Sequence, residues 1–113
     1  FLQSLKFNNP EMQKEVCQLL GLKAKYKGKR KKWWVKQTLF WQGEEIYRHS
    51  VEYQDLITRA YLCMFNQSSS FRNALKASGQ AVLTHSMGKS DASKTVLTRQ
   101  EFCSRLTELR GRL

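Results

Sequence analysis

Apolar side chains recur at three- and four-residue spacing between Leu56 and Phe65, and this is the clearest pattern in the chain. The stripe comprises Leu56, Ile57, Ala60, Tyr61, Met64 and Phe65. Such spacing places one apolar face along a helix. Ser50 precedes the stripe and is a good N-cap residue. The pattern therefore predicts a central amphipathic helix that begins after Ser50.

Three further helices are predicted by capping signals combined with the same periodicity. Asn9 and Pro10 favour a helix start, and that helix is expected to stop at Gly21. A helix after the serines at 68–70 is expected to close at Gly79 in the C′ position. Thr98 and Glu101 have the spacing of a capping box, so they predict a final helix. Its expected inner face comprises Phe102, Cys103, Leu106 and Leu109.

The segments between these helices are less regular. Residues 35–41 mix β-branched and aromatic side chains in near alternation, which is compatible with a strand or a short helix. Gly43 favours a hairpin turn leading into residues 46–49. Residues 22–32 are predicted to be a loop or frayed turn, 80–84 a short extended stretch, and 86–95 a loop. Residues 1–113 are thus expected to form a mainly α single domain with at most a small β-hairpin.

Positive charge is concentrated in one segment. The chain has 20 basic and 9 acidic residues and a net charge of +11. Eight basic residues fall within fourteen positions that contain no carboxylate: Lys23, Lys25, Lys27, Lys29, Arg30, Lys31, Lys32 and Lys36. Such a run favours a phosphate-bearing partner. The alternative is a solvated basic loop that only aids solubility.

Composition excludes several classes of protein. No apolar run approaches the roughly 18 residues of a transmembrane helix, and the start does not resemble a signal peptide. Three cysteines form no CxxC pair, and His49 and His85 lie far apart in the chain. We therefore expect a cytoplasmic protein with no membrane association, no metal site and no cofactor.

Several segments in order resemble a known family. They are QSLKFNNPEMQKEV, EYQDLITRAYLCMF, FRNALKASG, LTHSMGKSD and KTVLTRQEFCSRLTELR. This series is similar to the C-terminal part of the NADAR domain of the YbiA-like N-glycosidases. The resemblance implies a compact orthogonal helical bundle and hydrolysis of an N-glycosidic bond. The substrate would be an ADP-ribosylated nucleobase or a ribosylamino intermediate of the riboflavin pathway, both of which are phosphorylated ribosyl compounds.

The resemblance implies one half of a catalytic pair. Glycosidic hydrolysis uses two carboxyl groups, one near the sugar carbon and one near the leaving group. Asp91 is the candidate in the loop, and the family's second acid, a Glu, would precede Phe1. The chain is therefore expected to lack its N-terminal segment, and the full-length form is expected to be the active enzyme. Alternatively, Asp91 caps a turn. Asp55 is a competing carboxylate, although a helix-surface charge beside Arg59 is the favoured explanation for it.

Other residues are candidates for binding the substrate. Trp33 and Trp34 could stack on the base, with Trp34 preferred, because adjacent tryptophans on a regular element cannot both face inward. The loop offers His85, Ser86, Gly88 and Lys89 for ribose or phosphate. Lys36, Arg48 and Arg72 are candidate phosphate contacts. For each of these, a structural role in the core or on a solvated face is the alternative.

Two functions of different kinds are therefore open. The first is the N-glycosidase. The second is a non-catalytic basic helical module that binds nucleic acid or serves as a structural component. Nucleic-acid binding would weaken steeply with salt, by roughly 0.7 to 0.9 log unit per log unit of salt for each phosphate contacted.

Overall fold

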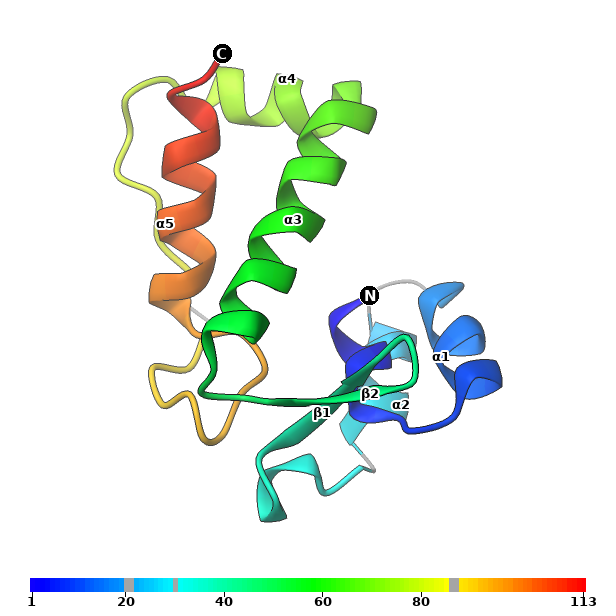
Figure 1. Ribbon diagram of the computed structural model, residues 1–113. Coiled ribbons are helices and arrows are strands. Elements are labelled where there is room, and N and C mark those ends of the chain that lie inside the picture. The colour runs from blue at the N-terminus through cyan, green and yellow to red at the C-terminus, as the bar shows by residue number, and fades with distance from the viewer. Residues whose placement is uncertain (20–21, 30, 86–87) are drawn as a thin grey trace.

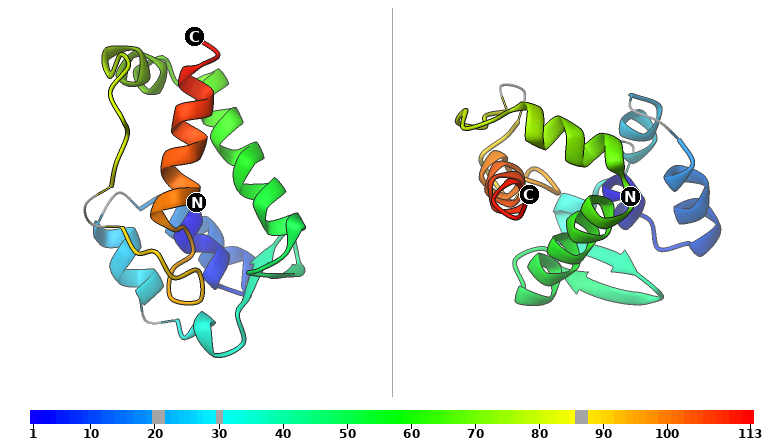
Figure 2. Two further views of the ribbon diagram at one scale, coloured as in Figure 1. Left: turned by 90° about the vertical axis from the view of Figure 1, so that its left-hand side faces the viewer. Right: turned by 90° about the horizontal axis from the view of Figure 1, so that it is seen from above.

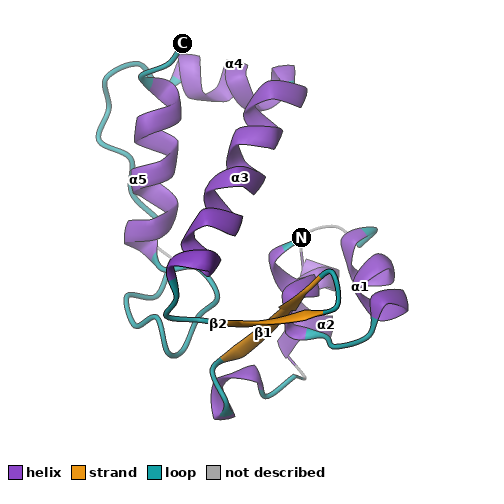
Figure 3. Cartoon of the chain, in the orientation of Figure 1, coloured by secondary structure: helices purple, strands orange, loops and turns teal. Residues whose placement is uncertain are grey.

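The computed structural model describes residues 1–19, 22–29, 31–85 and 88–113. Within those ranges the chain forms short 3-10 helices (η), α-helices and a hairpin (Figures 1 and 3). The elements, in order, are η1 (Leu2–Lys6), α1 (Pro10–Cys17), α2 (Leu22–Lys29), η2 (Trp33–Val35), β1 (Thr38–Trp41), β2 (Glu44–Tyr47), α3 (Val51–Gln67), α4 (Ser69–Ala77) and α5 (Arg99–Arg110).

Side-chain caps fix the starts of four helices. The Asn9 side chain accepts hydrogen bonds from the Glu11 and Met12 amides, and Pro10 occupies the first turn of α1. Ser50 caps α3 and Ser68 caps α4. Thr98 and Glu101 form the complete capping box of α5. These caps satisfy amides that have no partner within the helix, and they confirm the predicted starts.

The ambiguous stretch after Val35 is a strand. β1 and β2 pair antiparallel, with Leu39 opposite Ile46 and Trp41 opposite Glu44. The turn requires positive φ at Gln42 (50°) and at Gly43 (80°), a conformation that glycine adopts without strain. Leu39 is fully buried, so the hairpin contributes directly to the core.

The elements pack into two groups that share one core. α3 and α5 lie side by side and run in the same direction, with α4 across their ends (Figures 1 and 2). In the other group η1 contacts α1, α2 and β1. The hairpin joins the groups, because β1 contacts η1 while β2 contacts α3.

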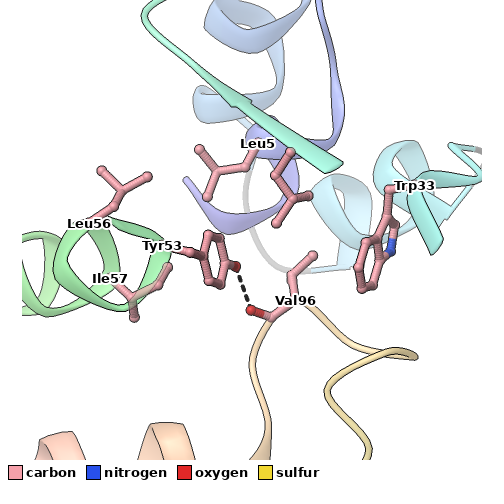
Figure 4. Close-up of a cluster of buried hydrophobic side chains, with 7 residues drawn as sticks. Leu5, Trp33, Tyr53, Leu56, Ile57 and Val96 are labelled. Carbon is pink, nitrogen blue, oxygen red and sulfur yellow. Dashed lines mark hydrogen bonds between the residues drawn. The ribbon is translucent and has the colours of Figure 1, made fainter. Parts of the chain in front are cut away.

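The shared core draws on segments far apart in sequence (Figure 4). Its buried side chains are Leu5, Trp33, Leu39, Tyr53, Leu56, Ile57 and Val96. Burial of such apolar surface is the main stabilising contribution. The Tyr53 hydroxyl donates a hydrogen bond to the Val96 carbonyl at 2.5 Å, which satisfies a polar group inside the cluster.

Two expectations about the fold are wrong. The protein is a mixed α/β fold and not a mainly α orthogonal helical bundle, because the antiparallel hairpin contributes Leu39 to the core and connects the two groups of helices. The basic segment from residue 22 is not a loop, since Leu22–Lys29 is the helix α2. The predicted stop of the first helix at Gly21 lies outside the described residues.

Candidate functional site

Asp91 lies on the surface as the cap of a tight turn. Its Oδ1 accepts hydrogen bonds from the Ser93 amide at 2.9 Å and the Ser93 hydroxyl at 2.7 Å. These two bonds, with smaller effects of the Lys94 and His49 charges, lower the pKa of the Asp91 carboxyl below its usual value. A carboxylate that caps its own loop in this way forms an Asx turn. Capping of this turn is therefore enough to explain why an aspartate occupies position 91.

The two tryptophans have different surroundings, as their adjacency predicts. The Trp33 side chain is 7% exposed and belongs to the core, whereas Trp34 is 46% exposed. Gln37 follows η2 and its Nε2 donates to both the Trp34 carbonyl and the Ser93 carbonyl, each at 2.8 Å. This amide holds the end of η2 against the Asp91 turn. Trp34 is thus an exposed aromatic on a fixed backbone.

A hollow of about 420 Å³ lies between the hairpin and the start of α3. It is lined by Trp41, Gln42, Glu44, Glu45, Ile46, Tyr47, Ser50, Glu52, Leu56 and Arg59. None of the residues that the sequence offered as site candidates is among them. Three glutamates against one arginine also give it a negative lining, which is unfavourable for a phosphate. The hollow is therefore not the site that the sequence predicts.

Two of the three candidate phosphate contacts serve the fold. Arg48 is 1% exposed and pairs with Glu101, while its Nε donates to the Thr95 carbonyl at 3.0 Å. Arg72 Nη1 donates to the carbonyls of Phe65 and Asn66, so it caps the end of α3. Lys36 is exposed at the C-cap of η2 and can reach a solvent ligand.

The predicted loop residues are gathered against the start of α5. The Gly88 amide donates to the His85 carbonyl at 3.1 Å, and the Arg99 amide donates to the Lys89 carbonyl at 2.9 Å. Gly88 is needed here because a Cβ at this position would clash with Cγ of Arg99. The His85 ring packs 5.2 Å from the Phe102 ring, measured between centroids. Ser86 lies outside the described residues.

Lys6, which the sequence did not single out, lies near Lys89 and near Lys25 of the basic segment. Lys6, at the end of η1, is partly buried, and burial is the main reason that its pKa falls from 10.5 to about 8. The charges of Lys89 and Lys25 lower it further. Lys25 of α2 and Lys89 of the 88–98 loop therefore each lie close enough to Lys6 for their charges to act on it. We call Lys6, Lys25 and Lys89 the lysine cluster.

Helix α2 extends this positive surface. Four of its eight residues are lysine, and it contains no carboxylate. The helix lies against η1 through Gly28, where a Cβ would clash with Oε1 of Gln3. Glu15 of α1 supplies a counter-charge, since its carboxylate lies 3.6 Å from Nζ of Lys27 at an exposed position. Among the described residues, most of the lysine charge on α2 is thus uncompensated.

Nothing in the described ranges indicates a metal centre or a membrane segment. No group of three or more His, Cys, Asp or Glu side chains there could hold a metal ion. No described helix is long and apolar enough to span a bilayer.

Comparison with known proteins identifies the family. The family described as "Bacteriophage protein GP30.3" matches residues 1–111, which is nearly the whole chain. The chain belongs to the bacteriophage GP30.3 family. A relative from Enterobacteria phage T4, described as "Uncharacterized 17.1 kDa protein in Gp30-rIII intergenic region", is 37% identical over 115 residues. The match covers 100% of this chain and 76% of the relative. No solved structure matches this GP30.3 family member.

Membership of the GP30.3 family overturns the resemblance to the NADAR domain. The descriptions that rested on it, a YbiA-like all-α hydrolase and glycosidase, are therefore wrong for this chain. The segments that suggested the resemblance include amphipathic helix patterns. In this protein those patterns pack helices against one another. Tyr61 of the AYLCMF segment, for example, packs edge to face on Phe102 of α5. Patterns of this kind recur wherever two helices share a core.

Proposed function

We propose that this GP30.3 family member is a non-catalytic module that binds the phosphate backbone of nucleic acid. The observation that carries the proposal is that Lys89 and Lys25, the latter on the lysine-rich helix α2, both lie close enough to Lys6 to repel its charge. Like charges held together destabilise a fold unless an anion neutralises them. A phosphate between these ammonium groups provides that neutralisation.

The position of Lys6 strengthens this argument. Burial disfavours its charged form, and two neighbouring cations add to that effect. The negative charge of a bound phosphate opposes the repulsion from Lys25 and Lys89. Phosphate binding is therefore expected to raise the pKa of Lys6. Each ammonium group contacted by a phosphate also releases a counterion from the nucleic acid, which makes affinity depend on salt.

A polymer fits the surface better than a small phosphorylated molecule. The lysine cluster continues into the other lysines of α2, which one or two phosphates could not neutralise together. The phosphates of a nucleic acid repeat along its backbone and can engage the cluster and the helix at once. ADP-ribose, which offers only two phosphates, is therefore the appropriate competitor in a test.

The test is fluorescence anisotropy of labelled oligonucleotides at salt concentrations from about 50 to 200 mM. We compare the wild type with a cluster variant, Lys6→Gln, Lys25→Gln and Lys89→Gln. The control variant is Lys14→Gln, Lys76→Gln and Lys94→Gln, which removes the same charge at exposed positions. The cluster variant should bind more weakly, and its salt slope should fall by about 0.7 to 0.9 for each phosphate that the lysines no longer neutralise.

Two results would contradict the proposal. Equal weakening by both variants would show that only net charge matters. Displacement of the oligonucleotide by ADP-ribose at stoichiometric concentration would show that the cluster is a small-molecule site.

A further inference from the structure

Tyr26 is an exposed aromatic at the centre of the solvent-facing side of α2. Its side chain is 64% exposed. Gly28 is buried and Ala24 half-buried on the side that lies against η1, so Tyr26 points away from that contact. Lys23 and Lys29, three residues before and after Tyr26, are both exposed and share its face. One aromatic ring thus stands between two cations.

Trp34 is the exposed aromatic of the next element, η2. It is 46% exposed, and the exposed lysines Lys32 and Lys36 stand two residues before and after it. Figure 2 shows that η2 follows α2 at the same end of the molecule. Two exposed aromatic rings thus lie in consecutive elements, each with an exposed lysine before and after it in the sequence.

Neither Tyr26 nor Trp34 stacks on another aromatic ring of the described residues. Lysines at i and i+4 on α2, as at 23 and 27, repel each other and weaken the helix. Exposing large aromatic side chains leaves apolar surface in water. Alternation of stacking rings and cations is instead the feature by which proteins bind single strands, with bases on the rings and phosphates on the cations.

We propose that the chain prefers single-stranded to double-stranded nucleic acid, and that Tyr26 and Trp34 each stack on an unpaired base. This inference rests on the proposed nucleic-acid binding and adds the kind of strand. A duplex offers the same phosphate charge but keeps the faces of its bases stacked inside the helix. Exposed rings therefore contribute to binding only when the bases are unpaired.

The test compares a labelled oligothymidine of about 15 nucleotides with a duplex of similar length, at one salt concentration. Tyr26→Leu and Trp34→Leu remove the ring but keep apolar volume and charge. Tyr26→Phe keeps the ring. The control is Tyr47→Leu, because Tyr47 is 55% exposed but lines the glutamate-rich hollow. Circular dichroism confirms that each variant keeps its helices.

The single strand should bind more tightly than the duplex. Each Leu variant should weaken single-strand binding by at least about fivefold, at the low end of what base stacking contributes. Duplex binding should hardly change, and Tyr26→Phe and Tyr47→Leu should match the wild type. Equal affinity for both forms, or an equal effect of Tyr26→Leu on both, would overturn the preference while leaving phosphate binding intact. Absence of binding to either form would instead overturn the proposed function.

Discussion

Arg48 and Glu101 form a bidentate ion pair in the interior, 53 positions apart in the chain. Nη2 of Arg48 lies 2.6 Å from Oε1 of Glu101, and Nη1 lies 3.1 Å from Oε2. The guanidinium also lies 4.8 Å from the centre of the Tyr53 ring. Gln54 and the Thr98 amide donate to the same carboxylate, so both of its oxygens are satisfied. The pair connects the end of the hairpin to the first turn of α5.

Replacing Arg48 should destabilise the fold strongly. Arg48→Met leaves the largely buried Glu101 carboxylate without its counter-charge, which costs about 3–5 kcal/mol. Urea unfolding followed by circular dichroism measures this cost. Arg112→Met is the matched control, because the Arg112–Glu108 pair is exposed and contributes at most about 1 kcal/mol. A similar loss in both variants would contradict the structural role of Arg48.

Stability should fall in acid because of Glu101. Burial alone would raise the pKa of this carboxyl, but hydrogen bonds from Arg48, the Thr98 amide and Gln54 hold it at about 2, against 4.5 in the unfolded chain. A lowered folded-state pKa gives stability that is present above pH 4.5 and lost as the pH falls to about 2. Allowing for solvent screening, we expect a loss of about 2 kcal/mol.

The effect of the carboxylate is measured by urea unfolding of the wild type and of Glu101→Gln between pH 4.5 and about 2. The difference between the two proteins should shrink toward low pH. A difference that stays constant would show that the carboxyl does not titrate in this window.

Replacing Lys6 should stabilise the protein while weakening its binding. The folded-state pKa of Lys6 is about 8, below the ordinary lysine value of 10.5, so the unfolded chain holds this proton more tightly. The resulting destabilisation is complete below pH 8 and is relieved as the pH rises toward 10.5. Lys6→Met should therefore raise the melting temperature at pH 7 and reduce affinity for an oligonucleotide.

Lys76→Met, on an exposed part of α4, is the control for Lys6→Met. It should leave the melting temperature almost unchanged. A lower melting temperature in Lys6→Met would show that the ammonium group stabilises the fold, contrary to this account.

Asp91→Asn should have little effect on the fold. Asparagine retains a side-chain oxygen that can accept the two hydrogen bonds from Ser93, so the turn is preserved. Removal of one negative charge should leave oligonucleotide affinity unchanged or slightly higher. Thermal unfolding and anisotropy measure the two effects. A marked loss of binding would show that the carboxylate contributes to the site.

Local signals in the sequence predicted much of the secondary structure. Ser50, Ser68 and the Thr98–Glu101 box act through neighbours within three residues, so their roles are visible without the fold. Helix α2 was missed because its stretch has no apolar stripe. It lies on η1 through Gly28, and a glycine offers no periodic signal.

Candidate roles that depend on distant residues could not be predicted in the same way. Arg48 was expected to contact phosphate because nothing near it in sequence shows that Glu101 will face it. Lys89 was singled out, but Lys6 and Lys25 meet it only after three separate segments have packed. Trp33 is buried and Trp34 exposed, as expected because adjacent side chains diverge on a regular backbone, whereas a base-binding role for Trp34 stays a prediction.

The ion pair between Arg48 and Glu101 also affects how the chain folds during its synthesis. The guanidinium emerges from the ribosome with the hairpin, whereas its carboxylate partner follows 53 positions later, and the Val96 carbonyl that Tyr53 needs follows 43 positions after Tyr53. Until then a cation and a phenol that the native core encloses must remain hydrated. In nascent chains that end before Glu101, the hairpin should accordingly remain sensitive to protease. In chains that extend through α5, the hairpin should become resistant to protease.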